Sequence, residues 1–486
     1  MTPDIARILY GLLIAWFIYM DRKRRTGVSG AVWLPVVWFI ILASKRLSAW
    51  LALGNEGEVS ESEADGSAID RILFLFLIVG AFIIVKRRNL NWSLLFARNR
   101  WLVALYVYLG VSAIWSDFTF ISFKRWFNDL GNVVMILLIF TEENPVQAIC
   151  AVFARCAYFL VPVSVLFIKF FSELGRGYNR FTGEGFYRGV ASDKNALGKL
   201  VIVLGLLLIW EFIQILRRGR ASWKIPDLAS YGLMTAMVLW LLNMAKSATS
   251  LACMVLGGAG IILFSLKIVR KKIKAVLGVG MAAVVILVAL SAFFDLKANM
   301  AEMLGRDPTL HGRDQIWKNV LSEHTNPLVG TGYYSFWLGG RATAISAKTG
   351  SHFVLNQSHN GYLELYLNGG IIGLFLLFGM MFDLGKSIFR QIQVDPDWGS
   401  VRLVFWVINI IHNWSEASYC IISPLWFVLL LITIRYPGSP NEREIPVVSE
   451  VMKPAPDPSN VSSPSVPREN GLSAGTPGSA GVSPAS

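Results

Sequence analysis

The chain has 486 residues, of which 54% are hydrophobic, and its mean hydropathy is +0.52. Long apolar runs recur along the sequence, which excludes an ordinary soluble domain. Basic residues outnumber acidic ones by 45 to 32, but they cluster in short loops between the apolar runs, so the charge reflects membrane topology and we expect no nucleic-acid partner. Since only helices satisfy their own backbone within a bilayer, the sequence predicts an all-α polytopic membrane protein.

The apolar runs predict about 12 to 13 transmembrane helices. In chain order, the candidate spans are 5–20, 31–50, 70–85, 101–115, 126–141, 147–170, 196–216, 228–245, 248–266, 275–294, 361–382, 402–419 and 423–436. Residues 1–436 thus form the membrane domain. Residues 437–486 are rich in Pro, Ser and Gly, and we expect a disordered cytoplasmic tail there.

The distribution of Lys and Arg predicts the orientation. Basic clusters occupy the loops near 22–25, 86–100, 217–224 and 267–274, and all four fall on the side that the positive-inside rule assigns to the cytoplasm. The N-terminus and one long loop, 295–360, then lie outside, and the C-terminus lies inside.

A few basic residues lie on the predicted external side. They are Lys45, Arg46, Lys124, Arg125, Arg176, Arg180, Arg188, Lys194, Arg306, Arg313 and Arg341. Arginine matches phosphate oxygens bidentately and stays charged at any relevant pH. Any one of these side chains could instead snorkel or pair with an acidic neighbour, as Arg313 could with Asp314. As a group, we interpret them as an anion-binding set at the depth of the lipid headgroups.

The residues Gln357, Ser358, His359 and Asn360 stand where the external loop enters an apolar helix. A helix N-terminus favours anions, and a histidine there can transfer a proton near neutral pH. The alternative is a histidine that only caps the helix. The other histidines of the loop and the four cysteines lack metal-ligand spacing, so we predict neither a metal site nor a cofactor.

Two further groups of side chains have open interpretations. The loop aromatics, which include Tyr333, Tyr334 and Trp337, could stack on sugar rings or anchor the loop at the membrane interface. The residues Asn409, His412, Asn413 and Glu416 recur on one face of a late helix, which fits a structural network or a supporting role in the site.

Several motifs resemble a known family. The segments GRDQIW, NPLVGTGYYSFW and NQSHNGYLELYLNGGIIGL resemble the O-antigen ligase and O-antigen polymerase family, and SAIWSDFTFISFKRW and LGRGYNRFTGEGFYRGVASDKNALG resemble its exopolysaccharide-production branch. The resemblance covers roughly residues 70–435. It implies a GT-C-like membrane fold and a metal-independent glycosyltransferase that uses undecaprenyl-diphosphate-linked glycans at the periplasmic face of a bacterial inner membrane.

The resemblance also implies roles for individual residues. His359 would be the general base, and Arg313 would bind the diphosphate. The other residues expected to bind the diphosphate or the glycan are Lys124, Arg125, Arg176, Arg180, Lys194, Asn195, Arg306 and Asn360. The acceptor would be a hydroxyl of a glycan, of a lipid A core or of another molecule.

A transporter or flippase for the same lipid-linked glycan is the competing interpretation. Transporters place charges near the membrane midplane, whereas the basic residues here gather at the external interface. The sequence leaves open whether the protein is a ligase or a polymerase, which sugars it handles and what its oligomeric state is.

Overall fold

The computed structural model describes residues 2–51, 67–178, 185–219, 223–272, 275, 313–349 and 354–442. Nearly all of the predicted span 275–294 and of the predicted tail lies outside these residues. The described part of the chain is helical, apart from one short antiparallel pair of strands, β1 (Arg176–Tyr178) and β2 (Gly185–Tyr187).

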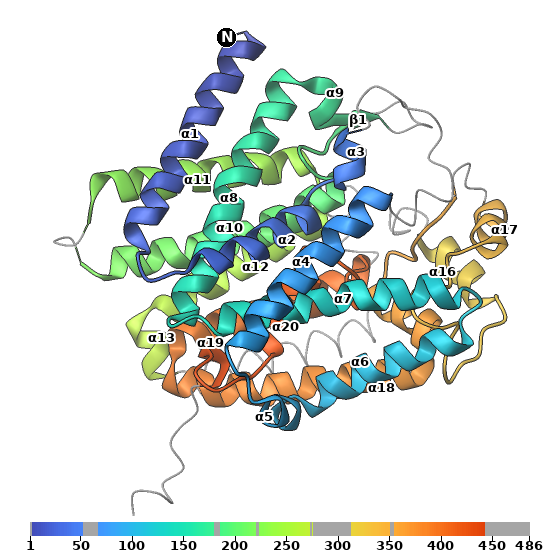
Figure 1. Cartoon of the computed structure of the whole chain (residues 1–486). Coiled ribbons are helices and arrows are strands. Elements are labelled where there is room, and N and C mark those ends of the chain that lie inside the picture. The colour runs from blue at the N-terminus through green and yellow to red at the C-terminus, as the bar shows by residue number, and fades with distance from the viewer. Residues whose placement is uncertain are drawn as a thin grey trace, which may run out of the picture. The chain divides into compact units, whose positions relative to one another are not determined.

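Helices of ten or more residues build the body of the molecule (Figure 1). They are α1 (Pro3–Arg24), α2 (Trp33–Ala43), α4 (Ala68–Arg87), α6 (Arg100–Val111), α7 (Thr119–Phe140), α8 (Pro145–Phe170), α10 (Lys194–Arg217), α11 (Ile225–Ala245), α12 (Ala248–Ser265), α18 (Gly361–Val394), α19 (Pro396–Ser415) and α20 (Pro424–Thr433). The shorter helices are α3 (Leu47–Leu51), α5 (Trp92–Arg98), α9 (Ser172–Gly175), α13 (Lys267–Lys271), α16 (Arg313–Leu321) and α17 (Gly340–Lys348), with 3-10 turns at Gly30–Val32, Ser112–Trp115 and Pro440–Glu442.

Seven of the described helices are long and apolar enough to cross a membrane, or eight if the bent pair α5–α6 counts as one span. The buried fraction of each helix distinguishes the central helices from the peripheral ones. In α8, 83% of the apolar window is buried inside the protein, against 28% in α4 and 11% in α1. The exposed apolar faces of α1 and α4 are those that lipid would cover. The prediction of a helical polytopic membrane protein is therefore confirmed.

Three predicted spans differ most from the helices observed. The sequence predicts one helix over 31–50, but the segment contains α2 and α3, separated at Ser44–Arg46. The segment 423–436 contains only the ten residues of α20, about 15 Å of helix, which is too short to cross a bilayer. In contrast, α18 continues beyond the predicted end to Val394, and it is broken near its start.

The break in α18 lies at Gly370, whose φ of 61° and ψ of −164° are not helical. The loop before α18 docks into this break. Carbonyl oxygens of Pro327 and Leu328 accept from the N–H groups of residues 371 and 372, at 2.9 and 3.2 Å. The N–H of Thr331 in turn donates to Leu367 at 2.9 Å. The loop thus satisfies backbone groups that the helix leaves unpaired, and a Cβ at Gly370 would overlap the backbone of Leu328.

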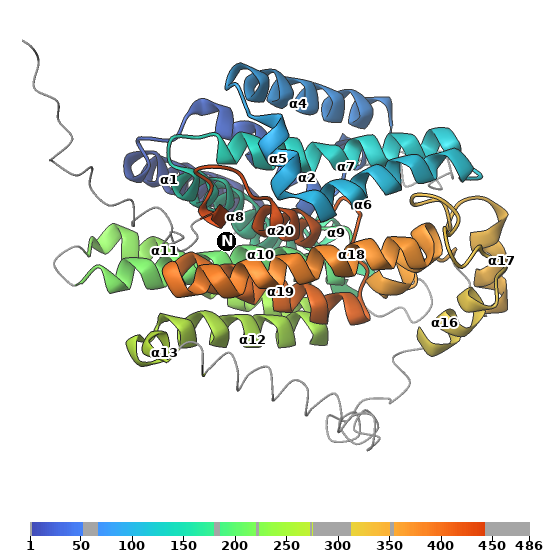
Figure 2. The same ribbon diagram turned by 90° about the horizontal axis from the view of Figure 1, so that it is seen from below.

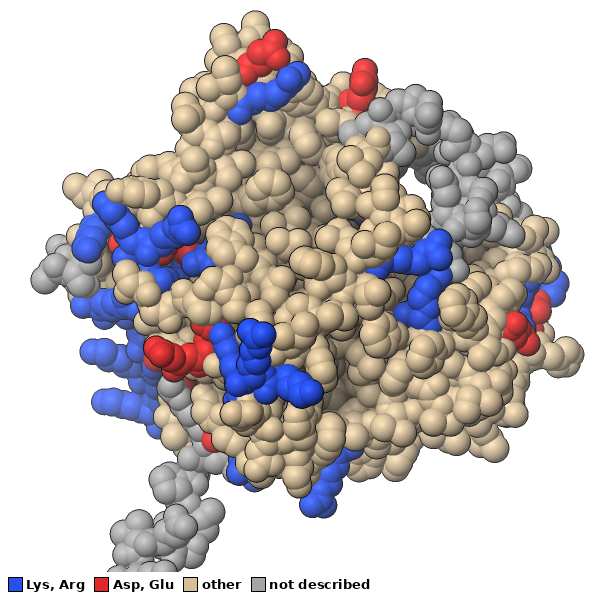
Figure 3. All heavy atoms as spheres, viewed as in Figure 1, with Lys and Arg blue, Asp and Glu red and all other residues tan. Residues whose placement is uncertain are grey.

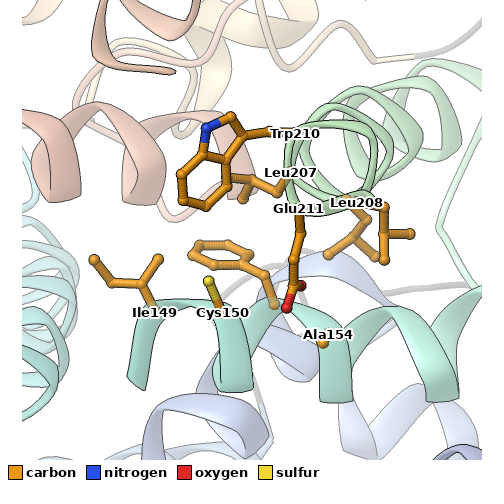
Figure 4. Close-up of a pocket in the computed structure, with 9 residues that line it drawn as sticks. Ile149, Cys150, Ala154, Leu207, Leu208, Trp210 and Glu211 are labelled. Carbon is orange, nitrogen blue, oxygen red and sulfur yellow. The ribbon is translucent and has the colours of Figure 1, made fainter. Parts of the chain in front are cut away.

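Ion pairs connect the helix ends at which the sequence predicts basic cytoplasmic loops. Arg24 at the end of α1 pairs with Asp227 in α11 at 2.6 Å, and Arg217 and Arg270 both pair with Asp397 at the start of α19. Arg25 pairs with Glu211, which also lines a small apolar pocket between α8 and α10 (Figure 4). These ends therefore gather on one side, as a common cytoplasmic face requires.

The candidate site residues lie at the opposite helix ends. Lys199 is near the start of α10, 18 residues or about 27 Å along the helix from Arg217, which is close to the thickness of the hydrocarbon core. Figure 3 shows basic side chains gathered near both ends of α4, and Figure 2 shows α16 and α17 at one end of the bundle.

Candidate active site

The peptide that carries His359 is fixed on both sides. The N–H of Ser358 donates to the buried carboxylate of Glu364, and the carbonyl oxygen of Ser358 accepts from Trp317 Nε1 at 2.8 Å. The Asn360 side chain then caps α18, because its oxygen accepts from the N–H groups of residues 362 and 363, both at 3.0 Å. In this arrangement Ser358, Asn360 and Glu364 each hold part of the backbone around the histidine. That backbone sets the direction in which the imidazole leaves the chain.

His359, Glu416 and Arg313 form one cluster. His359 Nδ1 lies 3.6 Å from Glu416 Oε2, and Arg313 Nη2 donates to Glu416 Oε1 at 2.9 Å. A second guanidinium nitrogen of Arg313 donates to the carbonyl oxygen of Ser415. The Glu416 side chain is only 4% exposed, whereas that of His359 is 27% exposed. A buried carboxylate therefore connects a guanidinium with an imidazole that solvent or a substrate can reach.

Glu416 lies beyond the end of α19 and is charged in this setting. Burial by itself raises the pKa of Glu416, but the neighbouring His359 side chain and the positive charges of Lys199 and Arg313 lower it by more, so the net pKa lies well below its ordinary value. Because the anion lies nearest to Nδ1, it favours the tautomer of the neutral ring that carries its proton on that nitrogen. In the neutral ring, Nε2 is then the nitrogen that can accept a proton.

A cavity of about 590 Å³ adjoins this cluster. It includes Gln357, two residues before His359, and Ala417, the residue after Glu416. The basic side chains that line it are Lys45, Arg46, Arg71, Lys124, Arg125 and Lys199. Its acidic lining residues are Asp70 and Asp193, and its apolar side is formed by Ile41, Leu42, Phe74, Ile421 and Ile422. The cavity thus combines a cationic wall with an apolar wall, as an anionic lipid headgroup requires.

The residues that the sequence predicts to bind the substrate fall into three groups. Some line the cavity, some are described but do not line it, and some lie outside the described residues. Lys124 and Arg125 line the cavity, and Arg125 also donates to the Tyr334 carbonyl oxygen at 2.6 Å. Arg176 lies on β1, donates to the Ile168 carbonyl oxygen at 3.3 and 3.2 Å, and is not among the lining residues. Lys194 and Asn195 begin α10 without lining the cavity. The last two, Arg180 and Arg306, lie outside the described residues.

Two basic residues at the site, Arg71 and Lys199, are not among those that the sequence assigns to anion binding. Arg71 comes from the first turn of α4 and Lys199 from the second turn of α10, whereas Lys45 and Arg46 of the predicted anion-binding set line the cavity from the α2–α3 turn. Of Arg71 and Lys199, only Lys199 could be recognised from the sequence as a site candidate, because a lysine inside an apolar helix is costly unless it faces a cavity or a partner. For Glu416, the contacts favour a supporting role in the site over a purely structural network, whereas Asn413 accepts from two backbone N–H groups in the turn after α19.

Two comparisons with known proteins bear on the class of this protein. Residues 233–378 match the family model described as O-antigen ligase. The chain is also similar to the exopolysaccharide production protein ExoQ of Rhizobium meliloti (strain 1021), with 26% identity over 298 residues. That alignment covers 58% of this chain and 63% of the relative, less than two thirds of its length.

The fold and the site define a polytopic helical membrane protein with an imidazole–carboxylate–guanidinium cluster beside a cationic cavity. The matched region contains both His359 and Arg313, so the comparisons include the centre of the site. Over residues 233–378, the chain is similar to the O-antigen ligase family.

Proposed function

We propose that this protein transfers or polymerises a glycan from an undecaprenyl-diphosphate-linked donor, at the periplasmic face of a bacterial inner membrane, in the synthesis of a surface polysaccharide or exopolysaccharide. The observation that carries this proposal is the cluster of His359, Glu416 and Arg313 next to a cavity with six basic lining residues. The match to the O-antigen ligase family supports the reaction class.

In the proposed reaction, a hydroxyl oxygen of the acceptor attacks the anomeric carbon of the donor glycan. The bond from that carbon to the phosphate oxygen breaks, and the lipid diphosphate leaves with the electron pair. The proton of the hydroxyl passes to Nε2 of His359, and the Glu416 carboxylate stabilises the imidazolium that results. Attack from the face opposite the leaving group inverts the anomeric configuration.

Positive side chains would stabilise the charge that the leaving diphosphate gains. Lys124 and Arg125 line the cavity, and Arg313 has further N–H donors beyond the two that bond to residues 415 and 416. We propose that these cations take the place that a metal ion has in other phosphate-leaving reactions. Arg176, Arg180, Lys194, Asn195, Arg306 and Asn360 remain candidates for binding the donor or the glycan.

The test is transfer by purified protein in detergent or nanodiscs, with a defined undecaprenyl-diphosphate-linked repeat as donor and release of undecaprenyl diphosphate as the readout. We expect His359→Ala to lower the rate by about 10²- to 10⁴-fold, the usual contribution of a positioned general base. The matched control is His324→Ala, which removes an exposed histidine of the same loop. Full transfer by a folded His359→Ala protein would contradict the mechanism.

Release of undecaprenyl diphosphate also distinguishes the proposed transferase from a transporter. A flippase moves the lipid-linked glycan between leaflets and leaves its phosphate–sugar bond intact. Translocation in vesicles without any release of undecaprenyl diphosphate would therefore replace the transferase proposal with a transport function.

A further inference from the structure

We infer that Lys199 is a direct ligand of the donor's diphosphate, an assignment that rests on the function proposed above. Lys199 lies in the second turn of α10, within the apolar sequence ALGKLVIVLG. It lines the cavity together with Ala196, three residues earlier on the same helical face. Its ammonium nitrogen donates to the Ala417 carbonyl oxygen at 3.2 Å, which holds it beside the turn that carries Glu416.

The position of Lys199 differs from that of a lysine at a membrane surface. A charged residue within an apolar helix is costly, and it is retained where it faces a water-filled cavity or a polar partner. An ammonium group has three N–H donors, and the Ala417 carbonyl oxygen accepts one of them. The remaining donors point to a ligand with several acceptor oxygens, which a diphosphate supplies.

A role limited to neutralising Glu416 accounts less well for these contacts. Among the described side chains, Arg313 pairs with Glu416 at 2.9 Å, whereas the hydrogen bond of Lys199 goes to a backbone carbonyl oxygen. Lys199 also lies on the wall of the same cavity as the cationic residues Lys124 and Arg125 on α7. The geometry therefore places its charge where a phosphate would bind, close to the proposed base.

The experiment measures binding without turnover. Farnesyl diphosphate serves as a short prenyl diphosphate probe, titrated by calorimetry into the full chain in detergent micelles. The variants are Lys199→Met and Lys199→Gln, which remove the charge, and Lys199→Arg, which keeps it. The control is Lys386→Met, which removes an exposed lysine from the cytoplasmic half of α18. Transfer assays on the same preparations give KM for the lipid-linked donor and kcat.

We expect Lys199→Met to weaken farnesyl diphosphate binding about tenfold or more, as the loss of a charge-assisted hydrogen bond predicts. Lys199→Arg should stay within about threefold of the wild type, Lys386→Met should be unchanged, and KM for the donor should rise with Lys199→Met. If Lys199→Met does not fold, Lys199→Gln decides in its place.

Two results separate this inference from the proposed function. Wild-type affinity in a charge-removing variant would overturn the assignment, and a lower kcat with unchanged probe affinity would make Lys199 a positioning residue for Glu416. Lysine-dependent binding in a wild-type protein that releases no undecaprenyl diphosphate from the donor would instead contradict the transferase proposal and leave the diphosphate site in place.

Discussion

The backbone of His359 has a φ of 56°, in the left-handed region that residues other than glycine rarely adopt. Tyr334 and Cys420, with φ of 53° and 55°, share this conformation, and both lie in segments that surround the cavity. Such strain persists where neighbouring contacts determine the backbone, and it is often found at functional sites. Here Ser358 and Asn360 supply those contacts on either side of the histidine, so they hold its backbone in this conformation.

Glu416→Gln tests whether the carboxylate supports the base. The substitution keeps the shape of the side chain but removes the anion that lies 3.6 Å from His359 and 2.9 Å from Arg313. We expect kcat to fall about 10- to 100-fold, because the imidazolium loses a charged partner. The pKa of Glu416 lies well below its ordinary value, so its carboxylate stays charged where an ordinary glutamate would protonate, and the difference between the two proteins should persist down to about pH 5. The measurement is the rate of transfer from about pH 5 to about pH 9, the range in which a histidine titrates.

The control for this substitution is Glu323→Gln, which removes a carboxylate of the loop 295–360, one that pairs with Lys348 at 2.6 Å. It should leave both the rate and the pH profile unchanged. A Glu416→Gln protein with a wild-type profile would show that the carboxylate only holds Arg313.

The residues that sequence patterns can identify are those with chemical signatures. His359 and Arg313 stand out by type and by resemblance, and the structure brings both to Glu416. A lysine within an apolar run indicates that Lys199 faces a cavity or a partner, but the cavity that it lines is built by several other segments and could not be predicted. Arg46 belongs to the predicted anion-binding set, but its place in the cavity depends on the turn between α2 and α3, which the predicted span 31–50 does not contain.

At the scale of elements, the break in α18 predicts the effect of Gly370→Ala. An alanine at a φ of 61° and a ψ of −164°, a region essentially restricted to glycine, costs on the order of 1–3 kcal/mol, and its Cβ would also overlap the backbone of Leu328 in the docked loop. We expect a loss of at least about 2 kcal/mol in the stability of this region, measured as a lower unfolding temperature in detergent, together with reduced transfer. The docked loop continues to Tyr333 and Tyr334 at the cavity, which explains the effect on activity.

Gly232→Ala is the matched control, because Gly232 lies in α11 and a Cβ added there would have no atom within 4 Å. An alanine within a helix is neutral or slightly stabilising relative to glycine. Equal thermal stability of the Gly370 and Gly232 variants would mean that the loop does not depend on the break.

Hydrophobic periodicity locates the long helices but not their interruptions. The predicted spans that correspond to α1, α4, α8, α10, α11 and α12 agree with those helices to within a few residues at their ends. In contrast, the breaks at Ser44–Arg46 and at Gly370 depend on tertiary contacts that no local pattern records, such as the hydrogen bonds from the loop near Leu328. The turn at Ser44–Arg46 lines the cavity, and the loop docked at Gly370 continues to it, so the least predictable elements are those that build the site.

At the scale of the whole molecule, the helix ends divide into a face linked by ion pairs and a face that carries the cavity, and this division predicts the orientation in the membrane. Lys348 in α17 belongs to the cavity end, and its side chain is 54% exposed; Lys386 belongs to the other end of α18. With the cavity in the periplasm, a cysteine at position 348 should react with a membrane-impermeant maleimide on intact spheroplasts. A cysteine at 386 should react only after permeabilisation. The wild type gives the background, because three of its four cysteines are buried. The reverse pattern would place the cavity in the cytoplasm and exclude a periplasmic reaction.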